Sequence, residues 1–96
     1  MYVTIRKYAG CGDLKEINRV ARDELLPVLR KVAGFRSYAV VDTGNGSAAS
    51  IGMFDSQAAA ETANQRAREV VQRTSLKDLL PNPPEITVGE VLSEAK

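Results

Sequence analysis

Four polar side chains in this sequence could act on a small molecule. Ser50 offers a hydroxyl on an expected strand, and Asn64 offers a carboxamide within an expected helix. Tyr38 carries a phenol that can donate to a bound oxygen atom, and Arg6 carries a guanidinium that can pair with a carboxylate. Such groups could position a substrate and stabilise its anion, which is the chemistry that this set suggests.

Each of the four residues also has a plainer structural interpretation. A serine hydroxyl on a buried strand often bonds only to nearby backbone, and asparagine is usually exposed. Tyr38 could be a packing group at an interface, and Arg6 could form an ion pair with Glu90 on the last expected strand. The residue types alone leave both alternatives open.

The chain contains no histidine, and Cys11 is its only cysteine. These counts exclude imidazole as a general base, Ser-His-Asp triads, an internal disulfide and a multi-cysteine metal site. Cys11 lies between two glycines with no histidine to activate it, so we expect a passive loop residue. We expect no metal and no organic cofactor.

Length and charge narrow the class of protein. The 96 residues, 44% of them hydrophobic, suit one domain over residues 1–96 whose small core oligomerisation would help. Thirteen basic and twelve acidic residues are interleaved, which argues against nucleic-acid binding. The start, MYVTIRKY, lacks the apolar centre of a signal peptide, and no run approaches about 18 apolar residues. We therefore expect a cytoplasmic protein without membrane contact.

The first half of the chain predicts a strand followed by a helix. Residues 2–8 alternate between apolar and polar types, which is typical of a strand. Asp13 is a candidate helix N-cap with Glu16 in capping-box spacing, and apolar residues then recur every three or four positions. Pro27 should kink or break this helix, and Gly34 should end it.

The second half predicts a hairpin, a helix and a final strand. Asn45-Gly46 indicates a two-residue turn within GFRSYAVVDTGNGSAASIGMF, because both positions of that turn need positive φ. Asp55 or Ser56 should cap an alanine-rich helix, and a strand is expected at 86–92. The order β-α-β-β-α-β predicts an α+β, ferredoxin-like fold, an antiparallel four-stranded sheet with two helices on one face.

Both sides of the predicted hairpin carry apolar groups. A two-residue turn puts Tyr38, Val40, Ile51 and Met53 on one side, and the other side holds these residues: Phe35, Ala39, Ser50, Gly52 and Phe54. A three-residue loop would reverse one strand. The first set would be a large exposed patch on a monomer, so we expect a homodimer with two sheets packed face to face.

The second set combines small residues with two phenylalanines at its ends. Ala39, Ser50 and Gly52 beneath an alanine-rich helix indicate either tight packing or a cavity for a small aromatic molecule. Phe35 and Phe54 would form the aromatic walls of such a cavity. A cavity volume below that of a benzene ring would rule out the enzyme hypothesis.

Nearly the whole chain resembles the antibiotic biosynthesis monooxygenase-like domains, small dimeric α/β-barrel proteins. The resemblance is carried by four segments: MYVTIRKYAG, LLPVLRKVAGFRSYAVVDTGNGSAASIGMFDS, AREVV and PPEITVGEVL. It implies a homodimer, and members of the superfamily include cofactor-independent monooxygenases of aromatic polyketides or quinols, haem-degrading enzymes and proteins without known activity.

The resemblance aligns specific residues with functional positions. Ser50 and Phe54 stand where polyketide-oxidising members carry an asparagine and a tryptophan. Phe54 and Asn64 stand at the tryptophan and the haem-ligating histidine of haem-degrading members, and Ile5 or Arg6 at their first-strand asparagine. Asparagine cannot replace an axial imidazole, so haem degradation is not expected. The candidate pocket is therefore Ser50, Phe54, Asn64, Phe35, Tyr38 and Arg6.

Three functional hypotheses follow. The first is a monooxygenase-like protein that oxidises an aromatic or quinone-like molecule with O2, the substrate itself supplying the electrons. The second is a non-catalytic ligand-binding or stress-associated dimer, which the missing histidine and tryptophan favour. The third is an interaction module with a filled interior.

Overall fold

The computed structural model describes residues 1–95 of the chain, and its element order is the β-α-β-β-α-β order that the sequence predicts. The elements are β1 (Tyr2–Tyr8), α1 (Leu14–Val20), the π-helical segment η1 (Ala21–Leu25), α2 (Leu26–Arg30), β2 (Phe35–Gly44), β3 (Ser47–Phe54), α3 (Gln57–Arg73), α4 (Leu76–Leu79) and β4 (Glu85–Glu90).

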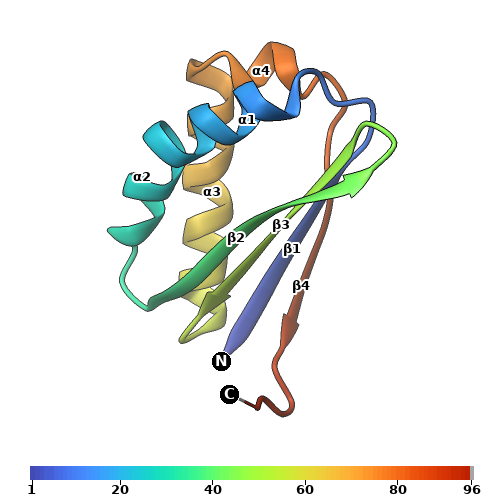
Figure 1. Cartoon of the computed structure of the whole chain (residues 1–96). Coiled ribbons are helices and arrows are strands. Elements are labelled where there is room, and N and C mark those ends of the chain that lie inside the picture. Colours follow the sequence, from blue (N-terminus) through green and yellow to red (C-terminus); the bar gives the residue numbers. More distant parts are fainter. Residues whose placement is uncertain (96) are drawn as a thin grey trace.

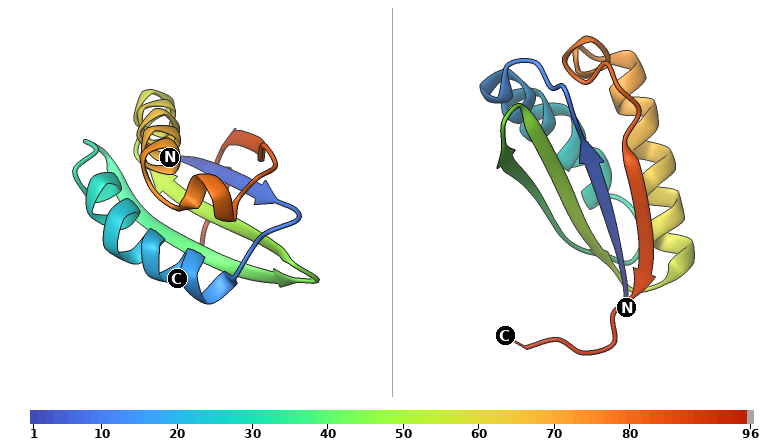
Figure 2. Two further views of the ribbon diagram at one scale, coloured as in Figure 1. Left: turned by 90° about the horizontal axis from the view of Figure 1, so that it is seen from above. Right: turned by 90° about the vertical axis from the view of Figure 1, so that its right-hand side faces the viewer.

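The four strands form one antiparallel sheet in the order β2-β3-β1-β4. The helices gather on one side of this sheet and leave the other side open (Figure 1 and Figure 2). This arrangement confirms the expected ferredoxin-like fold. No helix of residues 1–95 is long and apolar enough to cross a membrane.

Local signals start the helices where the sequence predicts them, although α2 ends at Arg30 and not at Gly34. The Asp13 carboxylate accepts a hydrogen bond from the Lys15 N–H at 2.9 Å, and the Ser56 hydroxyl accepts one from the Ala59 N–H at 3.1 Å. The second half of the capping box does not form, because Glu16 pairs with an arginine in its own helix.

The first helix is interrupted beside Pro27, as expected for a ring without an N–H donor. The helix widens into η1 at Ala21–Leu25, where the Leu26 N–H bonds to the Ala21 carbonyl five residues back. A π-helical turn of this kind is a known cause of a helix bend.

The Asn45-Gly46 turn is confirmed, but β2 carries an extra residue before it. Asn45 and Gly46 have positive φ values of 53° and 73°. Asp42 pairs with Ala48 whereas Gly44 pairs with Ser47, so one residue of β2 bulges out of the ladder. The Gly44 φ of 89° and a 2.9 Å hydrogen bond from the Gly44 N–H to the Asp42 carboxylate hold the bulge.

This bulge reverses the two sides of β2 relative to the prediction. Tyr38 lies opposite Gly52 and Val40 opposite Ser50, so both face the helices. Ala39 lies opposite Ile51 and faces away from them. The predicted sides of β3 are correct, and those of β2 between its two bulges are wrong, because one additional residue moves every side chain to the other face.

The two faces of the sheet therefore differ in character. The helix-covered face presents these residues from β1, β2 and β3: Thr4, Arg6, Tyr8, Tyr38, Ser50 and Gly52. The open face presents mostly apolar residues: Val3, Ile5, Ala39, Val41, Ile51 and Met53. Ile51 and Val41 remain 39% and 37% exposed in the single chain.

Candidate functional site

The polar residues beneath the helices are unusual for a core. Thr4, Arg6 and Ser50 are the buried polar residues of the described chain, with exposures of 2%, 4% and 6%. They lie on β1 and β3, which pair antiparallel with Arg6 directly opposite Ser50. Because side chains alternate along a strand, the Arg6 guanidinium and the Ser50 hydroxyl lie side by side under the helices.

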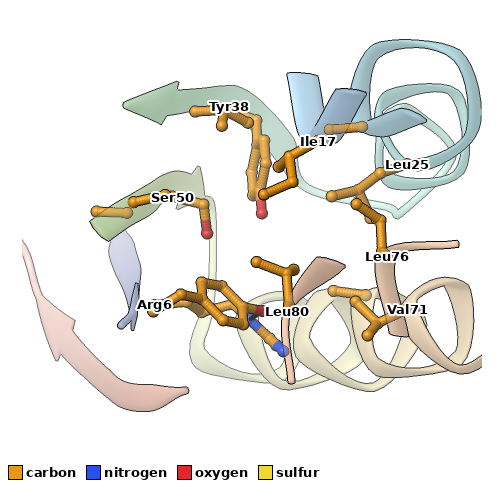
Figure 3. Close-up of a pocket in the computed structure, with 14 residues that line it drawn as sticks. Arg6, Ile17, Leu25, Tyr38, Ser50, Val71, Leu76 and Leu80 are labelled. Atoms are coloured by element: carbon orange, nitrogen blue, oxygen red, sulfur yellow. Dashed lines mark hydrogen bonds between the residues drawn. The ribbon is translucent and has the colours of Figure 1, made fainter. Parts of the chain in front are cut away.

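These residues line a small cavity between the sheet and the helices, with a volume of about 30 Å³. The polar groups of its wall are Arg6, Tyr8, Tyr38 and Ser50, and the rest is mainly apolar, including Ile17, Ala21, Leu25, Val71, Leu76 and Leu80. Figure 3 shows the hydroxyls of Tyr38 and Ser50 pointing into the space that Arg6 borders from the opposite side.

Arg6 is held by neutral groups. Its Nε donates a hydrogen bond of 3.0 Å to the Tyr8 hydroxyl, and its Nη1 donates a long one of 3.5 Å to the Asn64 carbonyl. The Tyr8 ring also lies 5.9 Å from the guanidinium carbon, within cation–π range. No carboxylate of residues 1–95 forms an ion pair with Arg6.

Tyr38 is a hydrogen-bond donor at neutral pH. Burial raises the pKa of its phenol, and the neighbouring Ser50 hydroxyl and Arg6 charge oppose that rise only in part. Desolvation disfavours the phenolate, so the O–H proton is retained. The cavity therefore offers two hydroxyls that can donate to a ligand oxygen.

A shallow groove adjoins the cavity and has a volume of about 430 Å³. The two share four wall residues, Arg6, Tyr8, Val71 and Leu80. The groove continues over these residues: Arg68, Gln72, Lys77, Pro81, Asn82, Pro83, Pro84 and Ile86.

Cys11 offers no second reactive centre. Burial raises the pKa of its thiol, and its Sγ lies 3.7 Å from the Tyr8 carbonyl oxygen. A protonated thiol is a poor nucleophile. Within residues 1–95, no cluster of three histidine, cysteine, aspartate or glutamate residues could hold a metal ion.

No family model matches the chain, and no curated protein matches it. Solved structures do match it over nearly its whole length. NE2512 from Nitrosomonas europaea, a protein of unknown function, superposes with a TM-score of 0.77 at 14% identity, covering 99% of this chain and 92% of that one.

Two further matches are oxygenases from Streptomyces. SnoaB of Streptomyces nogalater, a cofactor-independent oxygenase, matches with a TM-score of 0.75 at 14% identity over 97% of this chain and 94% of its own. The ActVA-Orf6 monooxygenase of Streptomyces coelicolor, solved with nanaomycin D, matches at 0.70 and 19% identity over 97% and 92%. The chain has the fold of the antibiotic biosynthesis monooxygenase-like domains.

Three of the sequence-predicted residues converge on the cavity of this monooxygenase-like fold, and three do not. Arg6, Tyr38 and Ser50 line the cavity. The other three are excluded from its wall: Phe35, Phe54 and Asn64. Phe54 is fully buried and packs edge-to-face against Phe35 with ring centroids 6.0 Å apart, so this pair belongs to the core.

Asn64 does not line the cavity but contacts β1, the strand that carries Arg6. Its carboxamide oxygen accepts a 2.9 Å hydrogen bond from the Thr4 hydroxyl, and its backbone carbonyl oxygen accepts the 3.5 Å hydrogen bond from Arg6 Nη1. The carboxamide therefore faces β1 instead of a ligand. Asn64 links α3 to the strand that carries Arg6.

Two expectations about individual residues are wrong. Tyr38 does not lie on the open face, because the bulge before the turn directs it toward the helices. Arg6 does not pair with Glu90, because Arg6 lies opposite Ile86 and Glu90 lies opposite Tyr2 at the far end of the strand.

Tyr8 is the main site residue that sequence reasoning missed. It continues the alternation that puts Thr4 and Arg6 on one side of β1, so the period-two pattern contained the signal. The apolar wall residues on α1, η1 and α4 had no such signal, since helix packing decides which of them meet.

Proposed function

We propose that this protein binds an aromatic or quinone-like small molecule between helices and sheet and oxidises it with O2. The observation that carries the proposal is the convergence of the Tyr38 and Ser50 hydroxyls on one mainly apolar cavity. Apolar walls with a few convergent polar groups are typical of small-molecule sites. The fold supports the choice of reaction, because SnoaB is a cofactor-independent oxygenase.

The proposed reaction needs no electron donor besides the substrate. For an anthrone-type substrate, the ring CH2 loses a proton to water, the resulting anion reduces O2, and the carbon becomes a carbonyl. One oxygen atom enters the product and the other leaves as water. Tyr38 and Ser50 contribute hydrogen bonds to the substrate oxygen that carries the negative charge, which stabilises the anion.

The cavity as it stands fails the size condition set for an enzyme, because it does not hold an aromatic ring. Its volume of about 30 Å³ fits one or two water molecules, whereas benzene occupies a cavity of roughly 150 Å³. A ring therefore enters only if the shared wall at Tyr8 and Leu80 moves and joins the cavity to the 430 Å³ groove. The proposal includes this side-chain movement.

We also propose that the open face packs against a second copy of the chain. Four strands of about seven residues span roughly 19 by 24 Å, so two faces together remove about 900 Å² in projection. That is close to the roughly 1,000 Å² expected of a specific interface. The apolar character of Val41 and Ile51 suits a self-complementary contact between identical sheets.

Ligand binding without turnover is the second candidate. The burial of Phe54 in the core, at the position where oxidising members carry a tryptophan, favours it. In this case Tyr38 and Ser50 orient a bound molecule and no oxygen is consumed.

Aerobic incubation with anthrone distinguishes the candidates. Oxidation should form anthraquinone and consume one O2 per product, and the Tyr38→Phe variant should be slower by about 10²-fold, as on loss of one oxyanion donor. A rise in melting temperature with anthrone but no oxygen uptake supports binding alone. If anthrone causes neither oxygen uptake nor a rise in melting temperature, both candidates are overturned.

A further inference from the structure

Arg6 carries a buried positive charge without an acidic partner. The residue is 4% exposed, and its partners within residues 1–95 are the Tyr8 hydroxyl and ring and the Asn64 carbonyl. A guanidinium keeps its charge in proteins, and a buried charge is costly unless it is paired. The site is therefore electrostatically incomplete in the protein alone.

The end of the guanidinium is free to bind. Nε is used by Tyr8 and Nη1 makes only the 3.5 Å contact, while no hydrogen bond of the described residues involves Nη2. No fully buried side-chain nitrogen or oxygen of residues 1–95 lacks a partner, so Nη2 is not fully buried. In Figure 3 the Arg6 nitrogens lie beside Leu80, at the wall that cavity and groove share.

The groove beyond Arg6 has positive charge and apolar surface but no acid. Arg68 and Lys77 line it together with Arg6, and none of its lining residues is aspartate or glutamate. Its apolar part consists of Val71, Leu80, Pro81, Pro83, Pro84 and Ile86. Such a surface favours a flat apolar body attached to an anion, and the like charges raise the local concentration of anions.

We propose that the bound molecule is an aromatic carboxylate, whose carboxylate pairs with Nη1 and Nη2 of Arg6 while its ring occupies the space formed when the cavity joins the groove. Carboxylate oxygens match the two nitrogens in a bidentate geometry that a neutral amide does not reproduce. This inference rests on the proposed function, since it names the class of molecule that the same site binds.

The test compares 2-naphthoate with 2-naphthamide, which share shape and differ in charge. Titration of the wild-type protein by isothermal calorimetry should give a dissociation constant at least about tenfold lower for the carboxylate, as expected for a charge-assisted pair. In an NMR spectrum of the same protein, the Arg6 Nε–H signal should shift on addition of 2-naphthoate.

Three variants test whether the preference for the carboxylate over the amide arises at Arg6. Arg6→Met should bind both ligands with similar affinity, and Arg6→Lys should retain part of the preference because it keeps the charge without the fork. Arg66→Gln is the matched control, since Arg66 lies exposed on the same helix as Arg68 but outside cavity and groove. It should keep the full preference.

The outcomes separate this inference from the proposed function. Equal binding of the two ligands to the wild-type protein overturns the carboxylate inference and leaves an aromatic site intact. A preference that persists in Arg6→Met, or an Arg6 signal that does not move, shows that the carboxylate binds elsewhere. Absence of binding by either ligand overturns the aromatic site itself.

Discussion

Each face of the sheet departs in part from the usual distribution of polar and apolar groups. The face covered by helices buries Thr4, Arg6 and Ser50, although Val40 on it stays 37% exposed, and the open face leaves Ile51 and Val41 exposed. A half-exposed antiparallel sheet normally shows the opposite pattern. Both departures have a functional interpretation. The helix-covered face, here called the inner face, is interpreted as a ligand site, and the open face, here called the outer face, as a contact between subunits.

The two faces contribute to different free energies, the outer face to association and the inner face to folding and ligand binding. Apolar area on the open face favours association roughly in proportion to the area removed from water. Polar groups on the inner face stabilise the fold only when each has a partner, and so they constrain geometry. Changes on the outer face should alter assembly, and changes on the inner face should alter stability and binding.

The largest effect is expected from Ile51→Asp in the middle of the open face. Two copies would bring two carboxylates into an apolar contact, so the dissociation constant of the dimer should rise by about 100-fold or more. Sedimentation velocity measures the change. Thr62→Asp on the exposed surface of α3 is the control and should leave assembly unchanged.

A wild-type protein that sediments as a monomer at micromolar concentration would remove the proposed role of the outer face. The exposed apolar residues of the open face would then need another explanation. Dissociation by Thr62→Asp as well would point to an effect of charge alone.

Gly52→Ala should cost the most on the inner face. A Cβ at Gly52 would lie 2.8 Å from the Phe54 ring and 3.0 Å from the Tyr38 ring, both closer than van der Waals contact. Overpacking of this kind should lower the free energy of unfolding by about 1–3 kcal/mol. Gly89→Ala is the control, since a Cβ there meets no atom within 4 Å. Equal urea midpoints for the two variants would contradict the close packing of Tyr38.

Sequence reasoning succeeded where a signal is local. The Asp13 and Ser56 caps, the break beside Pro27 and the Asn45-Gly46 turn each depend on the chemistry of a few neighbouring residues. The turn does not determine the register of β2, because Gly44 adds a second position that accepts positive φ. One bulge there reversed the predicted direction of Tyr38.

The candidate site was predictable only in part for the same reason. Ser50 lies on a strand whose alternation is uninterrupted, so its side of β3 followed from spacing. That Arg6 shares this side depends on the pairing of β1 with β3, which the sequence did not reveal. Tyr38 depended on the bulge, and Asn64 on the rotation of α3, which places its carboxamide against Thr4. Non-local packing, which a single sequence does not display, decided these two residues.

Thr4→Val tests the hydrogen bond behind the inner face. Loss of the 2.9 Å bond leaves the Asn64 carboxamide oxygen unpaired, so stability should fall by about 1 kcal/mol in urea unfolding. The double variant Thr4→Val with Asn64→Leu should recover part of this loss, because no polar group then remains unpaired. Thr62→Val, on the exposed surface of α3, should change little. An unchanged midpoint for Thr4→Val would show that the bond contributes no net stability.

The smallest effect is expected from the ionisation of Tyr38. Its pKa is raised in the folded protein by burial, so an unfolded chain ionises at lower pH, near 10 for an ordinary tyrosine. The associated stability is complete below that pH and is lost as pH rises through the folded pKa. Wild-type protein should therefore lose stability more steeply above about pH 10 than Tyr38→Phe, in melting temperatures measured as a function of pH. Because the other tyrosines titrate in both proteins, the difference between the two curves isolates Tyr38. Parallel curves would mean that the phenol reaches solvent and that the inner face is wetter than its contacts indicate.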